Sequence, residues 1–369
     1  MSKKRIACIV GARPNFMKMA PVLRAFEAYP NAETVLIHTG QHYDRNLSDV
    51  FFEELGIKSP DISLGIGSGS HGEQTGRLII ELEKVFMAAE PAFDRLLVVG
   101  DVNSTMAATL AAVKLNIPVA HVEAGLRSFD RRMPEEANRI VTDSLSDLLL
   151  VSEPSGVDNL RAEGQPEDRI RLVGNVMIDT LLHLVKQAAR RPLLQKLGIT
   201  PGSYAVVTAH RPSNVDTPET LKGLIDVLIG VSEVLPVIFP IHPRTLARLE
   251  SFDLLAALNT AKGVRLLEPL GYLDFLALTS QSKVIVTDSG GLQEESTALE
   301  IPCLTMRENT ERPVTVTEGT SVLCGSNPEL LNEHLQAVLN GTFKAGKCPA
   351  LWDGKAAERI AAEVMSKFS

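Results

Sequence analysis

"VIVTDSGGLQEESTAL", residues 284–299, contains the pattern on which the fold depends. An apolar, β-branched run is followed by Asp288, by Ser289-Gly290-Gly291 and then by a stretch with helical spacing. A buried strand, a tight turn and a helix in this order form the repeating unit of a parallel α/β sheet. The stretch therefore predicts a parallel sheet with helices on its faces.

The same alternation extends through the chain. It predicts strands at 5–10, 34–38, 95–100, 117–122, 148–152, 204–210, 236–242, 283–288 and 302–306, and helices at 16–29, 73–90, 104–116 and 218–235. The pattern restarts after a boundary near residues 172–176. We predict an α/β fold of two Rossmann-like parallel-sheet domains, residues 1–173 and 174–352. Such domains bind ligands at the carboxyl ends of their strands, in a cleft that they face.

Composition excludes several classes of protein. A chain of 369 residues is too long for one ordinary core, which agrees with two domains. The formal net charge of −8 argues against a nucleic-acid partner. The four cysteines are widely spaced and form no CxxC pair, which favours reduced, packed thiols and no metal site. The apolar run near the N-terminus is too short for a signal peptide, and no run is long enough to cross a membrane, so we expect a cytoplasmic protein without a membrane partner.

Two glycine-containing segments lack nucleotide-binding fingerprints. "GARPNFMK" (11–18) follows the first strand but has no G-x-G-x-x-G, so nothing supports an NAD cofactor. "GIGSGSHGEQTG" (65–76) lacks the GK[ST] of a P-loop and is interpreted as a loop that leads into a helix. We expect no cofactor.

Polar residues gather where the predicted strands of the first half end. Arg13 follows the first strand, and Lys18 lies in the helix after it. Asp101 follows Gly100 at the end of a second strand. Their positions favour a role in the cleft, whereas a solvated loop arginine and a helix-capping aspartate are the structural alternatives.

The second half offers an anion site. Backbone N–H groups at Ser289, Gly290 and Gly291 can approach a diphosphate closely, and the helix N-terminus adds partial positive charge. Glu295 lies about a turn and a half into the helix, where it can accept hydrogen bonds from ribose hydroxyls. The alternative is a capped helix whose acidic residues only suit its dipole.

Two further candidates follow strands of the second half. His210 lies beside Arg211 at a strand end, and Arg312 lies on a polar segment after a strand. A lone histidine is more often structural, but the position of His210 favours a function.

Residues 121–139, "HVEAGLRSFDRRMPEEANR", are unusually rich in charge. Glu123 follows a strand and Glu135 opens the next helix, so one segment can bring two carboxylates to one cleft. The alternative is a solvated charged loop, which fits Arg131, Arg132 and Glu136.

Taken together, these stretches resemble the non-hydrolysing UDP-N-acetylglucosamine 2-epimerases. The motifs that carry the resemblance span nearly the whole chain and are "GARPNFMKMAP", "TGQHYD", "GDVNST", "HVEAGLR", "PEEANR", "GNVMIDTL", "HR", "TDSGGLQEE" and "TERPV". The resemblance implies a glycosyltransferase-B-type fold, a UDP-sugar substrate, a homodimer and a C-terminal helix, within 353–369, that returns to the first domain.

The resemblance also implies roles for individual residues. It assigns catalysis to Asp101, Glu123, Glu135 and His210. It assigns substrate and UDP binding to Arg13, Lys18, His210, Phe275, Ser289, Gly290, Gly291, Glu295 and Arg312. "HRPSN" (210–214) and "GQHYDRN" (40–46) differ from the common bacterial patterns near a second, activating UDP-sugar site, so allosteric activation is not implied.

The implied reaction is C2 epimerisation by elimination of UDP to 2-acetamidoglucal and re-addition. That route needs a held diphosphate and carboxylates on both faces of the sugar, and no nicotinamide. Some relatives act on UDP-2,3-diacetamido uronic acids, which leaves the exact sugar open. Three rival functions also stay open, namely a glycosyltransferase of the same fold, a non-catalytic UDP-sugar sensor and a hydrolysing epimerase.

Overall fold

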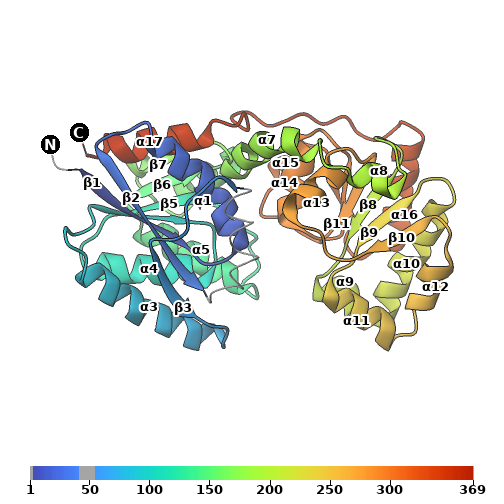
Figure 1. The fold of residues 1–369 in the computed structure, drawn as a ribbon, viewed down its shortest axis with the longest axis horizontal. Coiled ribbons are helices and arrows are strands. Elements are labelled where there is room, and N and C mark those ends of the chain that lie inside the picture. The colour runs from blue at the N-terminus through green and yellow to red at the C-terminus, as the bar shows by residue number, and fades with distance from the viewer. Residues whose placement is uncertain (1–2, 41–54, 369) are drawn as a thin grey trace. The chain divides into compact units, whose positions relative to one another are not determined.

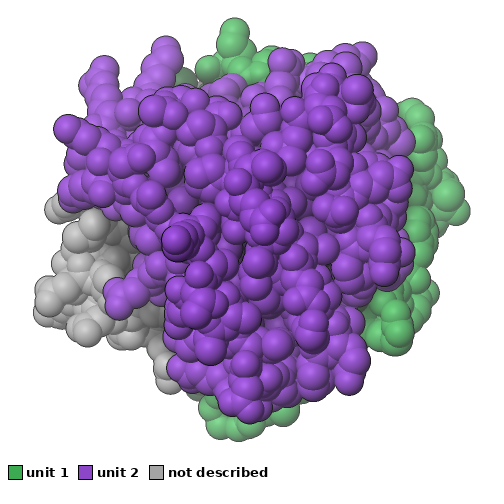
Figure 2. Space-filling model, turned by 90° about the vertical axis from the view of Figure 1, so that its right-hand side faces the viewer, with its two compact units in different colours: residues 1–180, 350–369 green, residues 181–349 purple. Residues whose placement is uncertain are grey.

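The computed structural model describes residues 3–40 and 55–368. The chain divides into two compact units, coloured separately in Figure 2. Unit 1 contains Met1–Thr180 together with Ala350–Ser369, and unit 2 contains Leu181–Pro349. Each unit is built on one parallel sheet (Figure 1).

The sheet of unit 1 has seven described strands in the order β3-β2-β1-β4-β5-β6-β7. Every pairing is parallel. The central strands are almost wholly buried, as apolar runs covered on both faces should be. The bounds are β1 Lys4–Val10, β2 Ala32–Gly40, β3 Ile62–Ile66, β4 Arg95–Val99, β5 Val119–Ala124, β6 Leu148–Val151 and β7 Ile170–Leu172.

The helices of unit 1 bury apolar stripes against this sheet. They are α1 Arg13–Phe26, α3 His71–Met87, α4 Asn103–Lys114, α5 Pro134–Leu145, α6 Pro154–Ala162, α17 Ala356–Ser366 and α7 Val176–Ala188, which continues into unit 2; η1 Glu167–Arg169 is a 3₁₀ turn. Helix α1 begins earlier than the predicted residue 16. Pro14 is tolerated there because the first turn needs no N–H from it.

The C-terminal segment is part of unit 1. Helix α17 contacts α1. The Asp179 carboxylate accepts the backbone N–H groups of Ala356 (3.2 Å) and Ala357 (2.7 Å) at the start of α17. The Trp352 indole N–H donates to the carbonyl of Ser152 at 3.2 Å. These buried contacts bind the end of the described chain to the first sheet's unit.

Unit 2 has six described parallel strands in the order β10-β9-β8-β11-β12-β13. Their bounds are β8 Ala205–Thr208, β9 Val237–Pro240, β10 Val264–Leu267, β11 Val284–Thr287, β12 Cys303–Thr305 and β13 Ser321–Leu323. The helices are α8 Leu193–Leu197, α9 Pro212–Val215, α10 Pro218–Ser232, α11 Pro243–Ser251, α12 Leu255–Thr260, α13 Tyr272–Thr279, α14 Gly290–Ala298, α15 Val314–Thr317 and α16 Pro328–Leu339.

The predicted fold class is confirmed, and a strand lies in each of the nine predicted stretches. Four described strands were not predicted, namely β3, β7, β10 and β13. Within the described ranges, no helix is long and apolar enough to cross a membrane, and no three His, Cys, Asp or Glu side chains are grouped to hold a metal ion. Three of the four cysteines are buried, and all four are free thiols.

Candidate active site

Glu123 lies on a β-bulge near the end of β5. Its φ is +71°, a left-handed conformation that non-glycine residues rarely adopt, and the β5–β6 register shifts between Val122 and Ala124. Bulges re-aim side chains and are frequent beside active sites. The Glu123 side chain is buried, and its Oε2 lies 2.5 Å from Nζ of Lys18 on α1. Two predicted site residues from different elements therefore meet.

The turn after β4 completes this part of the site. Gly100 has a φ of +70°. A Cβ added there would lie 3.4 Å from Glu123 Oε2 and 3.5 Å from both Lys18 Nζ and Asn15 Nδ2. Asn15 donates to the carbonyl of Val99 at 3.0 Å, which holds α1 against the end of β4. The carboxylate and the ammonium thus converge on a backbone position that has no side chain.

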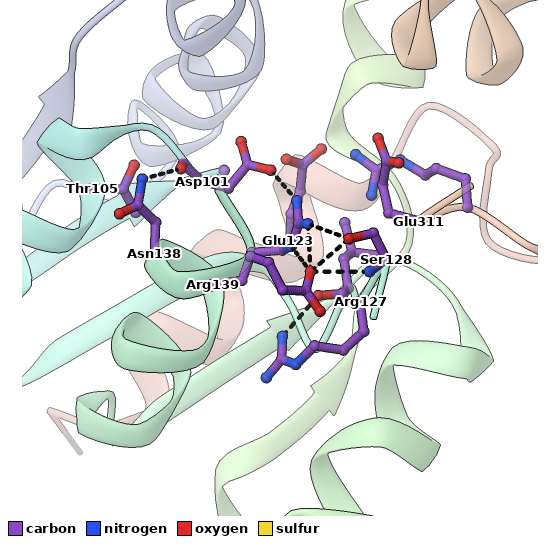
Figure 3. Close-up of polar contacts among 12 residues, drawn as sticks. Asp101, Thr105, Glu123, Arg127, Ser128, Asn138, Arg139 and Glu311 are labelled. Atoms are coloured by element: carbon purple, nitrogen blue, oxygen red, sulfur yellow. Dashed lines mark hydrogen bonds and ion pairs between the residues drawn. The ribbon is translucent and has the colours of Figure 1, made fainter. Parts of the chain in front are cut away.

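Asp101, the next residue, is held by a buried arginine. Arg139 Nη1 lies 2.5 Å from Asp101 Oδ2, and the Asp101 side chain is about one-third exposed (35%). The Asn138 amide donates to the Asp101 carbonyl at 2.8 Å (Figure 3). Both partners come from α5, so this helix fixes the backbone and the side chain of Asp101.

Glu136 was expected to lie in a solvated loop, and this expectation is wrong because its side chain is buried. It is 2% exposed and pairs with Arg139 at 2.5 Å. Its oxygens accept the N–H groups of Ser128 and Phe129 and the Ser128 hydroxyl, each at 3.0 Å. Burial alone would raise the pKa of Glu136, but the Ser128 and Arg139 contacts lower it. The charge-rich segment is therefore held as a fixed loop by a buried carboxylate.

The charged residues between positions 130 and 135 are exposed or partly exposed. Arg131 and Arg132 are exposed, as expected, and Arg132 pairs with Asp130 at 2.8 Å. Glu135 is partly exposed on the first turn of α5 and makes no hydrogen bond or ion pair with the described residues.

Arg13 is the first residue of α1, and its side chain lies outside the described residues, as do positions 41–46 of "GQHYDRN".

A buried histidine on β5 links this strand to α5 and to the turn after β4. His121 is fully buried, with Nδ1 2.6 Å from Asp143 Oδ1 and Nε2 2.9 Å from the carbonyl of Gly100. Asp143 also accepts the N–H of Gly125 at 3.0 Å and lies 2.7 Å from Arg127. Burial raises the pKa of Asp143, but His121 and Arg127 together lower it. The network ties both turns of the site to one buried carboxylate.

In unit 2 the predicted stretch forms the expected strand, turn and helix. Strand β11 ends at Thr287, Ser289 is the N-cap of α14, and the helix begins with Gly290. Asp288 Oδ2 accepts the N–H groups of His210 and Arg211, both at 2.8 Å. His210 Nδ1 lies 2.8 Å from Asp288 Oδ1, and its side chain is 42% exposed. Asp288 therefore orients the predicted histidine.

A carboxylate faces the N-terminus of α14. A Cβ added to Gly290 would lie 3.0 Å from Glu311 Oε1 and 3.4 Å from Arg307 Nη1. Arg307 Nη2 pairs with Glu311 at 2.7 Å. Burial raises the pKa of Glu311, but the Arg307 and Arg312 charges lower it to about 2. An anionic group and two arginines thus lie at the predicted diphosphate position.

The remaining predicted residues lie on α13, α14 and the segment before α15. Glu295 is 5% exposed and accepts the Tyr272 hydroxyl at 3.1 Å. Burial raises the pKa of Glu295 to about 7. Arg312 forms an ion pair with the buried Glu294. Phe275, one turn after Tyr272, is partly buried against the cluster around β11 and β12.

Sequence reasoning did not find several residues that hold the site, namely His121, Asp143, Asn138, Arg139, Tyr272, Arg307 and Glu311. Arg139 carried one signal, since it lies four residues after Glu135 and therefore one turn along the same helix. Arg307 and Glu311 pair with each other four positions apart, but nothing in the sequence marked either of them as part of the site. The remaining residues gave no signal, because their partners are at least 16 positions away.

Comparisons with known proteins point to one family. The family model described as UDP-N-acetylglucosamine 2-epimerase matches residues 24–365. The UDP-N-acetylglucosamine 2-epimerase of Methanocaldococcus jannaschii is 43% identical over 361 residues, which cover 96% of this chain and 97% of that protein. The UDP-2,3-diacetamido-2,3-dideoxy-D-glucuronate 2-epimerase of Pseudomonas aeruginosa is 39% identical over 368 residues, 99% of this chain and 100% of that protein.

A solved structure is similar along its whole length. The crystal structure of Methanocaldococcus jannaschii UDP-GlcNAc 2-epimerase in complex with UDP-GlcNAc and UDP has a TM-score of 0.86 at 41% identity. The match covers 98% of this chain and 99% of that one.

Proposed function

Because the chain belongs to the UDP-N-acetylglucosamine 2-epimerase family, we propose that it interconverts UDP-N-acetylglucosamine and UDP-N-acetylmannosamine. The C2 proton of the sugar is poorly acidic because no carbonyl carbon of the ring adjoins it. Expulsion of UDP from C1, with removal of the C2 proton by a base, gives 2-acetamidoglucal and UDP. Return of the proton to the other face of C2, with re-addition of UDP at C1, gives the epimer.

The observation that carries the proposal is the Glu123–Lys18 pair on the β5 bulge. Backbone strain at a buried carboxylate is costly and typical of functional sites. Glu123, Asp101 and Glu135 are proposed to exchange protons with the sugar, and His210 to assist at the leaving group. Lys18 holds the Glu123 carboxylate in place, and Arg139 holds that of Asp101.

UDP is proposed to bind through unit 2. The N–H groups at Ser289, Gly290 and Gly291 open α14, where the helix dipole favours a diphosphate. Arg312 would supply positive charge, Glu295 would accept ribose hydroxyls, and Phe275 would contact the base. A role of Arg13 in UDP binding stays a prediction. The reaction requires no redox cofactor.

A second substrate is favoured by one relative. The Pseudomonas aeruginosa protein, 39% identical over nearly the whole chain, is named for a UDP-2,3-diacetamido uronic acid. The same elimination would serve that sugar, so the mechanism does not distinguish the two. A homodimer and a cytoplasmic location stay predictions, which size-exclusion chromatography with light scattering and cell fractionation would test.

Incubation with UDP-N-acetylglucosamine in D₂O, followed by NMR, tests the proposal. We expect deuterium at C2, formation of the manno epimer without added nicotinamide, and traces of UDP and 2-acetamidoglucal. Epimerisation without deuterium would contradict the elimination. Free N-acetylmannosamine as the main product would indicate a hydrolysing enzyme, and sugar transfer to an added acceptor would indicate a glycosyltransferase. Reaction of the diacetamido uronic acid alone would change only the substrate.

A further inference from the structure

Glu295 has one oxygen bound and one oxygen unbound. Its Oε1 accepts the Tyr272 hydroxyl at 3.1 Å. Its Oε2 is buried and has no hydrogen-bond partner among the described residues. Burying a polar atom without a partner is costly, and such atoms in native proteins require an explanation. An acceptor of this kind, about a turn and a half into α14, is suited to receive a donor from a ligand.

The hydrogen bond from Tyr272 favours the ionised carboxylate of Glu295, the form in which both oxygens accept hydrogen bonds. The pKa of Glu295 is raised to about 7, mainly by burial, against the hydrogen bond from Tyr272, which lowers it; the charge of neighbouring Glu294 contributes to the rise. Glu294 is itself paired with Arg312. The Tyr272 hydroxyl therefore both orients the carboxyl group and stabilises its ionised state, in which both oxygens can accept.

The helix that carries Tyr272 also carries a predicted base contact. Tyr272 and Phe275 are three residues apart on α13, so their side chains share one face of the helix. If Phe275 contacts the base, the same helix face reaches the sugar attached to it. A ribose offers hydroxyl donors and the uracil offers its N3–H, whereas a diphosphate offers none. A nucleotide with the same base but no ribose hydroxyls separates the two kinds of donor.

We propose that Tyr272 is a positioning residue, which holds Glu295 so that Oε2 accepts a ribose hydroxyl and selects ribonucleotides over nucleotides that lack it. The inference rests on the proposed function, because it assumes that a uridine nucleotide binds at α14. Tyr272 acts through Glu295 and does not itself contact the substrate.

Calorimetry with UDP and 2′,3′-dideoxy-UDP tests the inference, since the two ligands share base and diphosphate. Hydrogen bonds to charged groups contribute enough to expect at least a tenfold preference of the wild-type protein for UDP. We expect Tyr272→Phe to reduce this preference at least about threefold, through weaker UDP binding, with little change for the dideoxy ligand. Tyr204→Phe is the matched control, because it removes a buried hydroxyl of the same unit that donates to the Leu278 carbonyl.

Further variants separate positioning from a general structural role. Glu295→Gln should reduce the preference as well, and adding Tyr272→Phe to it should reduce it little further, because the two residues act as one unit. Equal weakening of both ligands by Tyr272→Phe, or an unchanged preference, would overturn this inference alone. Failure of the wild-type protein to bind UDP would overturn the proposed function together with it.

Discussion

The Lys18 ammonium and the Glu123 carboxylate lie 2.5 Å apart, and Glu123 reaches this position through a backbone φ of +71°. The bulge orients a buried acid that a regular strand would have aimed elsewhere. The pair is the part of the site in which local strain and charge pairing coincide.

We expect Glu123→Gln, Asp101→Asn and Glu135→Gln each to lower turnover while leaving UDP affinity nearly unchanged. Loss of a general acid or base costs about 10²–10⁴-fold in rate. Turnover by NMR and UDP binding by calorimetry measure the two effects. Asp130→Asn is the control, because Asp130 pairs with exposed Arg132 in the same segment. Near-normal turnover of all three variants would refute the proton-transfer roles.

Arg139→Met should destabilise unit 1 strongly. It would leave the buried Glu136 without its ion pair and release Asp101, and breaking a buried pair typically costs about 3–5 kcal/mol. Urea unfolding gives the difference in free energy. Arg132→Met, which breaks an exposed and solvent-screened pair, should change stability far less than Arg139→Met does. Similar values for the two variants would contradict the structural role of Arg139.

Arg312→Ala should weaken UDP binding. Charge-assisted hydrogen bonds to phosphate contribute about 1.5–3 kcal/mol, roughly a 10- to 150-fold loss of affinity. Arg244→Ala is the control, since exposed Arg244 of the same unit pairs with Asp216. Thermal unfolding is measured in parallel, because the variant leaves buried Glu294 without Arg312. Unchanged UDP affinity in both Arg312→Ala and Glu295→Ala would place the nucleotide elsewhere.

From the raised pKa of the buried Glu295 carboxyl group, we predict that stability depends on pH. Its pKa is about 7 in the folded protein and near the ordinary 4.5 when unfolded. Between these values the folded state binds more protons, so the contribution of Glu295 to stability falls as pH rises through 4.5 to 7. Glu295→Gln removes this loss. The Tm difference, Gln variant minus wild type, should therefore be larger at pH 8 than at pH 5, and a reversed order would contradict the burial of an ionising group.

Asp179→Ala tests how α17 is attached. The variant removes the acceptor of two buried N–H groups at the start of the helix, which should cost about 1–3 kcal/mol. Thermal unfolding measures the loss, and limited proteolysis should show earlier cleavage near residues 350–356. Asp353→Ala, which removes a more exposed carboxylate paired with Arg359, should have a smaller effect. Equal effects would mean that the cap does not hold the helix.

The strands that sequence reasoning missed share one property. Among the strands that the structure describes, β3, β7, β10 and β13 are the four at the edges of the two sheets, and each is only partly buried. Central strands are covered on both faces and produce continuous apolar runs, whereas an edge strand of three to five residues has no such signature.

In the candidate site, residues at the ends of central strands could be predicted from the sequence, whereas contacts between distant residues could not. Asp101, Glu123, His210 and Ser289 could be predicted because each lies at or just after the end of a buried strand. The contacts of Arg139 with Asp101 and of Tyr272 with Glu295 could not, because each joins residues more than 20 positions apart. Only packing brings such pairs together.

The attachment of α17 to unit 1 determines when unit 1 can complete its fold during synthesis of the chain. Residues 181–349 form one uninterrupted stretch, but unit 1 needs residues on both sides of it. On the ribosome, α17 emerges only after all of unit 2 has been translated, so until then the surface of α1 that α17 contacts stays uncovered. Unit 1 therefore cannot be completed before residues 181–349 have been translated, and an isolated unit 1 would need a new peptide link between residues 180 and 350.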